Sequence, residues 1–450
     1  MKKRFLFIMC FCLLMIGISL NINLKDKDKI NNLTGKVLNI NNENVTIQDD
    51  EDIIYTFNIK KHDIDVGDKI IIKYTGVIDK NNHKQHCKVI NYNETKETIE
   101  ENGIPTSYLD DGIFSDYYVM AYNKLKTLSL DEKIGQLLLV RYPDNNQIED
   151  LKKYKFSGFV FYEKDFKDKT KNEVINMIEN LEKNSSIPLL TSVDEEGGKI
   201  IRISSNSNLI DTPFKSPSEL YNNGGFTKIK EDTKYKSEIL HSLGLNVNLA
   251  PVVDVSTNSN DYIYERTLKQ DTNKVSDYAK TVIEASKGTN VSYVLKHFPG
   301  YGNNSDTHIS SSTSSKSYED LLKYDIPPFK SGIDVGAEAI LVSHNIVSSI
   351  DSSSPASLSI NNHNILRDDL NFTGVILADD LDMGALDNIS NKSLKALLAG
   401  NNLIITTDYK ESFNEIKSAI NNNELSEDTI DKLVFKVLAW KYYKGLFLSK

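Results

Sequence analysis

The chain has 450 residues, of which 39% are hydrophobic and 26% are charged, and its formal net charge is −10. This apolar content suffices for a large buried core and excludes an intrinsically disordered chain. Because 63 acidic residues outnumber 53 basic ones and no long run of Lys and Arg occurs, a sequence-independent grip on nucleic acid is excluded, and we expect no nucleic-acid partner.

Residues 1–24 are predicted to be a signal peptide or an N-terminal anchor. A basic start, Lys2-Lys3-Arg4, precedes the uncharged stretch from Phe5 to Leu20. As a helix this stretch would reach about 24 Å, short of the ~30 Å hydrocarbon core, which favours export with cleavage. The small residues Gly17 and Ser19 suit cleavage, but no Ala-x-Ala pattern is present, so an uncleaved anchor is the alternative. We therefore expect a secreted or cell-surface protein, membrane-anchored if the segment is not cleaved, with membrane or cell-wall association through the N-terminus.

Residues 31–96 are predicted to form a small all-β module. Five short runs rich in β-branched residues are separated by turn clusters, a pattern that resembles a small OB-like or SH3-like β-barrel. We expect this module to hold a catalytic domain away from the envelope, and a glycan-binding role is the alternative. Residues 97–116 are predicted to be a linker. The expected strands are Leu33 to Leu38, Val45 to Gln48, Ile53 to Ile59, Lys69 to Tyr74 and Lys88 to Tyr92.

Residues 117–450 are predicted to form an α/β domain, a (β/α)8 TIM-type barrel. Near-continuous apolar runs alternate with amphipathic helical segments, as expected for a parallel sheet covered by helices. Eight such runs favour a closed barrel, and a doubly wound open sheet is the alternative. The expected strands are Gly135 to Val140, Gly158 to Tyr162, Pro188 to Val193, Val247 to Val253, Tyr293 to Phe298, Ala339 to Val342, Gly374 to Ala378 and Leu403 to Thr407.

Charged or polar residues recur where these predicted strands end. In a barrel, catalytic groups gather at the C-terminal ends of the strands, so the pattern predicts one shared site. The residues are Asp194 with Glu195 and Glu196, Asp254, Lys296 with His297, His344, and Asp379 with Asp380. Because neighbouring side chains at a strand end point to opposite faces, we expect only one of Asp379 and Asp380 to face the barrel axis.

Asp306 and His308 are two residues apart in a loop rich in Gly, Asn and Ser. In extended backbone such residues project to the same side, so the carboxylate can orient the imidazole. An imidazole titrates near pH 6.5, which suits a group that donates a proton and later accepts one.

Five ordered motifs between 193 and 383 resemble glycoside hydrolase family 3, in particular its NagZ-like β-N-acetylglucosaminidase branch. They are Val193-Asp194-Glu195-Glu196-Gly197-Gly198 with Arg202, Asn248 to Asp254, Arg266, Lys296-His297-Phe298-Pro299-Gly300-Tyr301-Gly302 with Asp306-Thr307-His308, and Ala378-Asp379-Asp380-Leu381-Asp382-Met383. The resemblance implies that Asp379 is the nucleophile and that His308 with Asp306 forms the acid/base dyad. It also implies that the terminal sugar is bound by Asp194, Arg266, Lys296 and His297.

Three positions depart from the family pattern. Tyr301 stands where the family often has a second His, Thr307 replaces a common Ser, and Ser310 to Ser315 replaces a tighter continuation that contains Pro. The dyad residues are retained, so we expect altered loop geometry rather than loss of the acid/base function. If His308 is not the proton donor, Glu195 and Glu196 are the carboxylates to consider.

The favoured hypothesis is an exo-acting, retaining β-N-acetylglucosaminidase, a β-N-acetylhexosaminidase that removes non-reducing N-acetylglucosamine from peptidoglycan-derived glycans. Its partners would be N-acetylglucosamine-containing glycans or muropeptides, and we expect a monomer. No His-Glu-x-x-His or related cluster occurs, so neither metal nor cofactor is expected. The alternatives are a β-glucosidase or a glycosyl phosphorylase of the same family, or a catalytically degenerate wall-binding protein.

Overall fold

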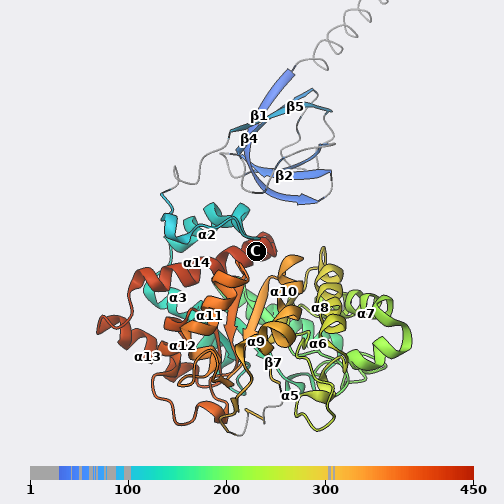
Figure 1. Ribbon diagram of the computed structural model, residues 1–450. Helices are drawn as coiled ribbons and strands as arrows, with labels where there is room; N and C mark the ends of the chain where they lie inside the picture. Colours follow the sequence, from blue (N-terminus) through green and yellow to red (C-terminus); the bar gives the residue numbers. More distant parts are fainter. Residues whose placement is uncertain are drawn as a thin grey trace, which may run out of the picture. The chain divides into compact units, whose positions relative to one another are not determined.

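The computed structural model describes residues 30–449 apart from 42, 50–52, 60–63, 65, 67–68, 76–77, 79–87, 96–102, 303–305 and 308–309. The predicted signal or anchor at residues 1–24 lies outside the described residues. The chain forms two compact units, Met1–Ser107 and Tyr108–Lys450. Figure 1 shows a small antiparallel sheet in the first unit and a barrel surrounded by helices in the second.

The first unit contains the five expected strands in one antiparallel sheet with the order β3-β2-β1-β4-β5. Alternate side chains are buried, among them Val45 and Ile47 on β2 and Tyr55 and Phe57 on β3, which confirms the half-buried strand pattern. Within the described residues β3 pairs with β2 alone, so the sheet is open and the expected barrel-like closure is not seen. The strands are β1 (Ile30–Asn41), β2 (Asn44–Gln48), β3 (Ile54–Asn58), β4 (Lys69–Thr75) and β5 (Lys88–Thr95).

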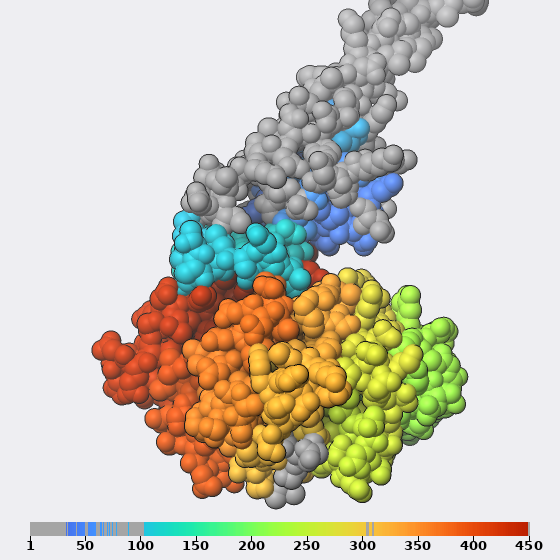
Figure 2. Space-filling model, in the orientation of Figure 1, coloured from blue at the N-terminus to red at the C-terminus, as the bar shows by residue number. Residues whose placement is uncertain are grey.

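The barrel unit begins earlier than expected, at Tyr108 rather than at residue 117. The Tyr108 hydroxyl donates to Asp428 at 2.9 Å, and its ring lies 5.5 Å from that of Phe435. Both partners belong to α14 (Glu427–Tyr443), on which α2 (Tyr118–Leu125) also packs (Figures 1 and 2). Residues 108–116 are therefore part of the barrel unit, because a few apolar side chains in a polar segment dock on the last helix.

Eight parallel strands close into a barrel with the order β10-β12-β14-β15-β6-β7-β8-β9. Closure confirms the TIM-type barrel and excludes the doubly wound open sheet. One expected strand starts late, because the Ser129 and Glu132 capping box begins a helix that uses residues up to Gly135. The strands are β6 (Leu138–Arg141), β7 (Gly158–Phe161), β8 (Leu190–Val193), β9 (Val247–Asn248), β10 (Ser292–Phe298), β12 (Ala339–Val342), β14 (Val375–Ala378) and β15 (Leu403–Thr406).

Helices cover the outside of the barrel and turn apolar faces toward the strands (Figure 1). No helix among the described residues is long and apolar enough to cross a membrane. A short pair, β11 (Thr313–Ser314) with β13 (Ile346–Val347), joins two loops beyond the strand ends. The remaining helices are α3 (Leu130–Gly135), α4 (Gln147–Tyr154), α5 (Glu163–Phe166), α6 (Lys171–Asn184), α7 (Pro217–Ser242), α8 (Thr272–Ser286), α9 (Tyr318–Asp320), α10 (Ile326–Asp334), α11 (Ile360–Asn364), α12 (Lys392–Ala399) and α13 (Tyr409–Asn421).

Candidate active site

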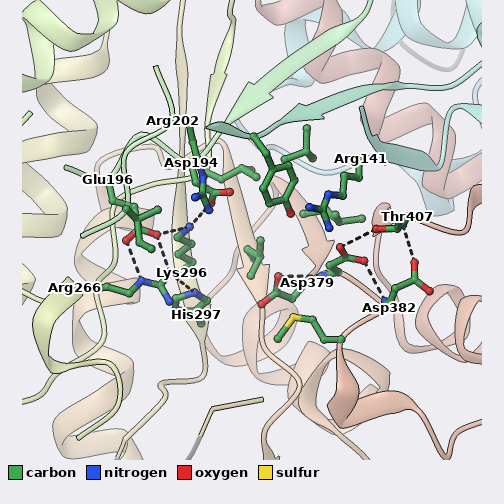
Figure 3. Close-up of a pocket in the computed structure, with 18 of the residues that line it drawn as sticks. Arg141, Asp194, Glu196, Arg202, Arg266, Lys296, His297, Asp379, Asp382 and Thr407 are labelled. Atoms are coloured by element: carbon green, nitrogen blue, oxygen red, sulfur yellow. Dashed lines mark hydrogen bonds and ion pairs between the residues drawn. The ribbon is translucent and has the colours of Figure 1, made fainter. Parts of the chain in front are cut away.

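A pocket of about 380 Å³ opens at the C-terminal ends of the barrel strands (Figure 3). Such an opening is where barrel enzymes place their catalytic groups. Of the residues expected there from the strand pattern, Asp194, Glu196, Lys296, His297, Asp379 and Asp380 line the pocket, whereas Glu195, Asp254 and His344 are not among its lining residues. The charged and polar residues that line it are Arg141, Tyr162, Asp194, Glu196, Arg202, Tyr262, Arg266, Lys296, His297, Asp379, Asp380, Asp382 and Thr407.

Four charged side chains form a compact ion-pair network on one wall. Glu196 accepts two hydrogen bonds from the Arg266 guanidinium, at 3.0 and 2.7 Å, and its Oε1 lies 2.7 Å from Lys296 Nζ. Lys296 also donates to Asp194 at 2.5 Å. Burial by itself raises the pKa of Glu196, but Arg266 and Lys296 outweigh it and hold that pKa well below the usual range. Glu196 therefore stays ionised and is unsuited to donate a proton.

His297 is oriented by Asp254, a residue at the end of a predicted strand to which the sequence alone assigned no role. The buried Asp254 carboxylate lies 2.8 Å from His297 Nδ1 and also accepts the His297 backbone N–H at 3.1 Å. The other ring nitrogen, Nε2, lies 3.2 Å from the Arg266 guanidinium. This network assigns the donor role to Nδ1–H and the acceptor role to Nε2. His297 is thus fixed between an anion and a cation at the pocket wall.

Asp379 and Asp380 both line the pocket, which contradicts the expectation that only one would. The strand β14 ends at Ala378, so the alternation of side chains no longer governs the residues that follow. The Asp380 backbone N–H donates to Asp379 Oδ1 at 2.9 Å. Burial, with the carboxylates of Asp382 and Asp379, raises the pKa of Asp380 to about 6. The pocket thus holds two neighbouring carboxylates, and the pKa of Asp380 lies above the ordinary value of an aspartate.

Asp382 binds backbone groups that follow the neighbouring strand. It accepts the backbone N–H groups of Thr407 and Asp408, at 2.6 and 2.9 Å, and pairs with Lys392 at 3.0 Å. These contacts, against the opposing effect of burial, lower its pKa. Asp382 therefore ties the segment after β14 to the end of β15.

His344 is a second residue whose role the strand pattern alone did not define. It is fully buried, with Nδ1 2.7 Å from the Ser357 hydroxyl and Nε2 2.9 Å from the Asp380 carbonyl oxygen. A carbonyl can only accept, so Nε2 carries the proton and Nδ1 accepts from Ser357. His344 thereby fixes the backbone beside the two pocket carboxylates.

The proposed acid/base loop is described only in part, because His308 lies outside the described residues. Asp306 lies beside Tyr262, whose pKa is raised by burial and by the Asp306 carboxylate. Since Tyr262 lines the pocket, Asp306 belongs to the pocket surroundings. Thr307, the residue between the two dyad members, is fully buried.

Glu195 is not among the residues that line the pocket. Its carboxylate accepts the backbone N–H groups of Arg202 and Ile203, each at 2.8 Å, and the Ser204 hydroxyl at 2.5 Å. Burial raises the pKa of Glu195 and outweighs the effect of these hydrogen bonds, which lower it. Because Glu195 is fully buried and bonded to this turn, it supports the loop rather than reaching a substrate.

Comparison with known proteins agrees with this geometry. Residues 129–440 match the sequence profile of the Glycosyl hydrolase family 3 N terminal domain. The chain belongs to glycosyl hydrolase family 3. Five residues that carried the family resemblance, Asp194, Arg266, Lys296, His297 and Asp379, line the pocket.

Curated relatives are similar over about half of this chain. A Beta-hexosaminidase of Nitrosomonas eutropha is 28% identical over 242 residues, which cover 52% of this chain and 69% of the relative. Beta-hexosaminidase LpqI of Mycobacterium tuberculosis is 29% identical over 268 residues, covering 57% of this chain and 68% of LpqI. The solved structure of M. tuberculosis LpqI has a TM-score of 0.64 at 26% identity and covers 70% of this chain and 95% of the LpqI chain.

The fold of this family is shared by proteins of different activity. The structure of the Beta-glucoside phosphorylase BglX has a TM-score of 0.66 at 20% identity, covering 77% of this chain and 63% of the BglX chain. That likeness concerns the fold alone, so the choice between hydrolysis and phosphorolysis depends on the site.

The pKa of Asp380 generates a prediction about stability. Its unfolded-state pKa is near 3.9, and the folded value is about 6, so the folded state binds more protons between these values. The contribution of the protonated Asp380 carboxyl to the free energy of unfolding is therefore lost as the pH rises through about 6. Asp380→Asn should therefore raise the free energy of unfolding at pH 8 by about 2–3 kcal/mol and change it little below pH 4.

Urea unfolding at pH 8 and at pH 4 measures this difference. Asp382→Asn is the matched control with the opposite sign, because the pKa of Asp382 is lowered and its charge stabilises the fold above that pKa. A less stable Asp380→Asn variant at pH 8 would contradict the prediction.

Proposed function

We propose that this protein is an exo-acting, retaining β-N-acetylglucosaminidase that removes non-reducing N-acetylglucosamine from peptidoglycan-derived glycans. One observation carries the proposal: Asp379 lies on one side of the pocket, and Asp194, Arg266, Lys296 and His297 lie on the other (Figure 3). A sugar held by the polar side chains would present its anomeric carbon to a carboxylate. The Beta-hexosaminidase relatives support the choice of an N-acetylated sugar.

In the first step, the Asp379 carboxylate attacks the anomeric carbon while the bond to the aglycone oxygen breaks. His308 gives its proton to that oxygen, and a glycosyl ester of Asp379 forms. In the second step, His308 takes a proton from water, whose oxygen attacks the anomeric carbon and releases Asp379. Two inversions leave the β configuration unchanged.

The assignment of the proton donor to His308 rests on the family motif, and the structure disfavours the two glutamates that the sequence offers as alternatives. Glu196 is held ionised by Arg266 and Lys296, and Glu195 is bonded to a backbone turn away from the pocket. Neither glutamate suits proton donation at the pocket, which favours the loop that carries Asp306 and His308. Asp306 would orient the imidazole and stabilise its charged form.

An acidic substrate is supported by two arginines that line the pocket, Arg141 and Arg202. Both guanidinium groups lie against the Tyr162 ring, at 4.1 and 5.2 Å from its centroid. Among the described residues neither side chain forms an ion pair within 4.0 Å, and Arg202 Nε is buried without a hydrogen-bond partner. A carboxylate on the substrate, such as the lactyl group of a muramic acid residue, would compensate these charges.

Phosphate is the competing anion for the same arginines, so a glycosyl phosphorylase is the second candidate function. Arginine binds both phosphate and carboxylate through its paired N–H donors. Incubation with inorganic phosphate separates the two candidates, because a phosphorylase yields the sugar 1-phosphate whereas a hydrolase yields the free sugar.

The test of the proposed function is an assay of the chain from Asn21 onward on the nitrophenyl β-glycosides of N-acetylglucosamine and of glucose. We expect faster release from the N-acetylglucosaminide, with free sugar as product. Preference for the glucoside would support a β-glucosidase. No turnover of either substrate would support the catalytically degenerate wall-binding protein.

Asp379→Ala should lower turnover by roughly 10³-fold or more and leave the melting temperature nearly unchanged, because it removes the nucleophile from the pocket rim and not from the core. Rates on nitrophenyl N-acetylglucosaminide and thermal melting measure the two effects. Asp380→Asn serves as the neighbouring control and should keep more activity than Asp379→Ala. If Asp380→Asn lost more activity than Asp379→Ala, Asp380 would be the nucleophile.

Arg141→Gln should lower selectivity for an acidic aglycone. We compare N-acetylglucosaminyl-β-1,4-N-acetylmuramic acid with N,N′-diacetylchitobiose, which lacks the lactyl carboxylate. The ratio of their kcat/KM values should fall about 10–100-fold, since a charge-assisted bond is removed from one substrate alone. Arg141→Lys keeps the charge and should give a smaller loss. A parallel decline on both substrates would mean that Arg141 does not recognise the carboxylate.

We also propose that the protein is exported and works in the secreted or cell-surface space. The basic start and the apolar segment before Asn21 support this location, since they match the pattern of a secretory signal. Fractionation of cells that express the full chain should place it outside the cytoplasm. Recovery of the intact chain, Met1 included, from the cytoplasm would contradict export.

A further inference from the structure

Tyr301, where the chain departs from the family pattern, is anchored to the same carboxylate that orients His297. Its backbone N–H donates to Asp254 at 2.6 Å. The side chain is buried, and its ring centroid lies 5.7 Å from that of Tyr262 and 5.5 Å from that of His297. The position of Tyr301 is therefore coupled to the sugar-binding wall of the pocket.

The hydroxyl of Tyr301 contacts Thr307 twice. It accepts the Thr307 backbone N–H at 2.9 Å, and it lies 2.5 Å from the Thr307 hydroxyl. Thr307 is fully buried, so water cannot replace these bonds. Tyr301 and Thr307 are both departures from the family pattern, and here they form one hydrogen-bonded pair.

Thr307 is also bonded from the opposite side of the pocket. Its carbonyl oxygen accepts the backbone N–H of Ala385 at 3.1 Å, in the segment that follows Asp379. Thr307 thus links the sugar-binding wall, through Tyr301 and Asp254, to the chain that carries the proposed nucleophile. The residue lies directly between Asp306 and His308 in the sequence.

We propose that the Tyr301 hydroxyl is the positioning group that holds the Asp306-Thr307 backbone in place relative to Asp379. The inference rests on the proposed function, because its consequence is the correct placement of the acid/base dyad. Loss of the hydroxyl would leave a buried N–H and a buried hydroxyl without their partner. A misplacement of the dyad by about 1 Å is enough to slow proton transfer by about 10²-fold.

The test is Tyr301→Phe, which keeps the ring and removes the hydroxyl. We expect kcat/KM, which reports the first step, to fall about 10–100-fold on methyl β-N-acetylglucosaminide, whose leaving group needs a proton, and less than threefold on the nitrophenyl substrate. This dependence on the leaving group is the readout that a purely structural role would not produce.

Variants of Thr307 test whether the loss of rate in Tyr301→Phe arises from the hydrogen bonds between Tyr301 and Thr307. Thr307→Ser keeps a hydroxyl and should retain most of the wild-type rate, whereas Thr307→Val should show part of the Tyr301→Phe loss. The double variant Tyr301→Phe/Thr307→Val should be no slower than Tyr301→Phe, as expected for residues that act as a unit. The control Tyr409→Phe removes a buried hydroxyl bond to Asp150 outside the pocket and should slow both substrates equally or not at all.

A measurement without substrate separates this inference from the proposed function. Amide hydrogen exchange in the peptide that contains Thr307 should be at least 10-fold faster in Tyr301→Phe than in the wild type. If the exchange rate is unchanged and kcat/KM shows no leaving-group dependence, Tyr301 does not hold the loop. If His308→Ala lacks leaving-group dependence, the proposed acid/base role fails, and the exchange rate still decides whether Tyr301 positions Thr307.

Discussion

The site depends on the burial of paired charge at one wall of the barrel opening. Asp194, Glu196, Arg266 and Lys296 are largely removed from water, and each charge has its counter-ion within 3.0 Å. An unpaired charge in this position would be strongly destabilising. Removal of one member would leave its partners buried without a counter-ion. The same network leaves N–H donors and carboxylate oxygens in fixed places, which is what recognition of sugar hydroxyls requires. Glu196 contributes to this arrangement as a permanent anion.

A second layer of buried groups controls where the pocket residues lie. Asp254 orients His297 and the backbone at Tyr301, and His344 holds the Asp380 carbonyl. These contacts reach the backbone, so they fix the strand-end loops rather than single side chains. Since loops lack the regular hydrogen bonding of strands, such side-chain bonds to backbone groups supply the rigidity that a catalytic arrangement needs.

The two sides of the pocket differ in electrostatics. The wall with Glu196 has its charges paired, whereas Arg141, on the side of Asp379 and Asp380, has no ion-pair partner among the described residues (Figure 3). Burial, together with two neighbouring carboxylates, raises the pKa of Asp380, a cost in stability that is typical of functional sites. The two walls therefore differ in whether their charges are paired.

The sequence by itself determined the eight barrel strands and the pocket positions of Asp194, Arg266, Lys296, His297 and Asp379, because apolar periodicity and ordered motifs are local properties. It also identified Asp254 and His344 at strand ends, without their partners. Only the tertiary structure decided the closure of the barrel, the open edge of the N-terminal sheet, the start of the catalytic unit at Tyr108 and the exposure of both Asp379 and Asp380 to the pocket. It likewise revealed the bonds of Glu196 to Arg266 and of Tyr301 to Thr307. Such outcomes depend on which distant groups meet and on where the backbone leaves a strand, and neither is encoded in the spacing of residues along the chain.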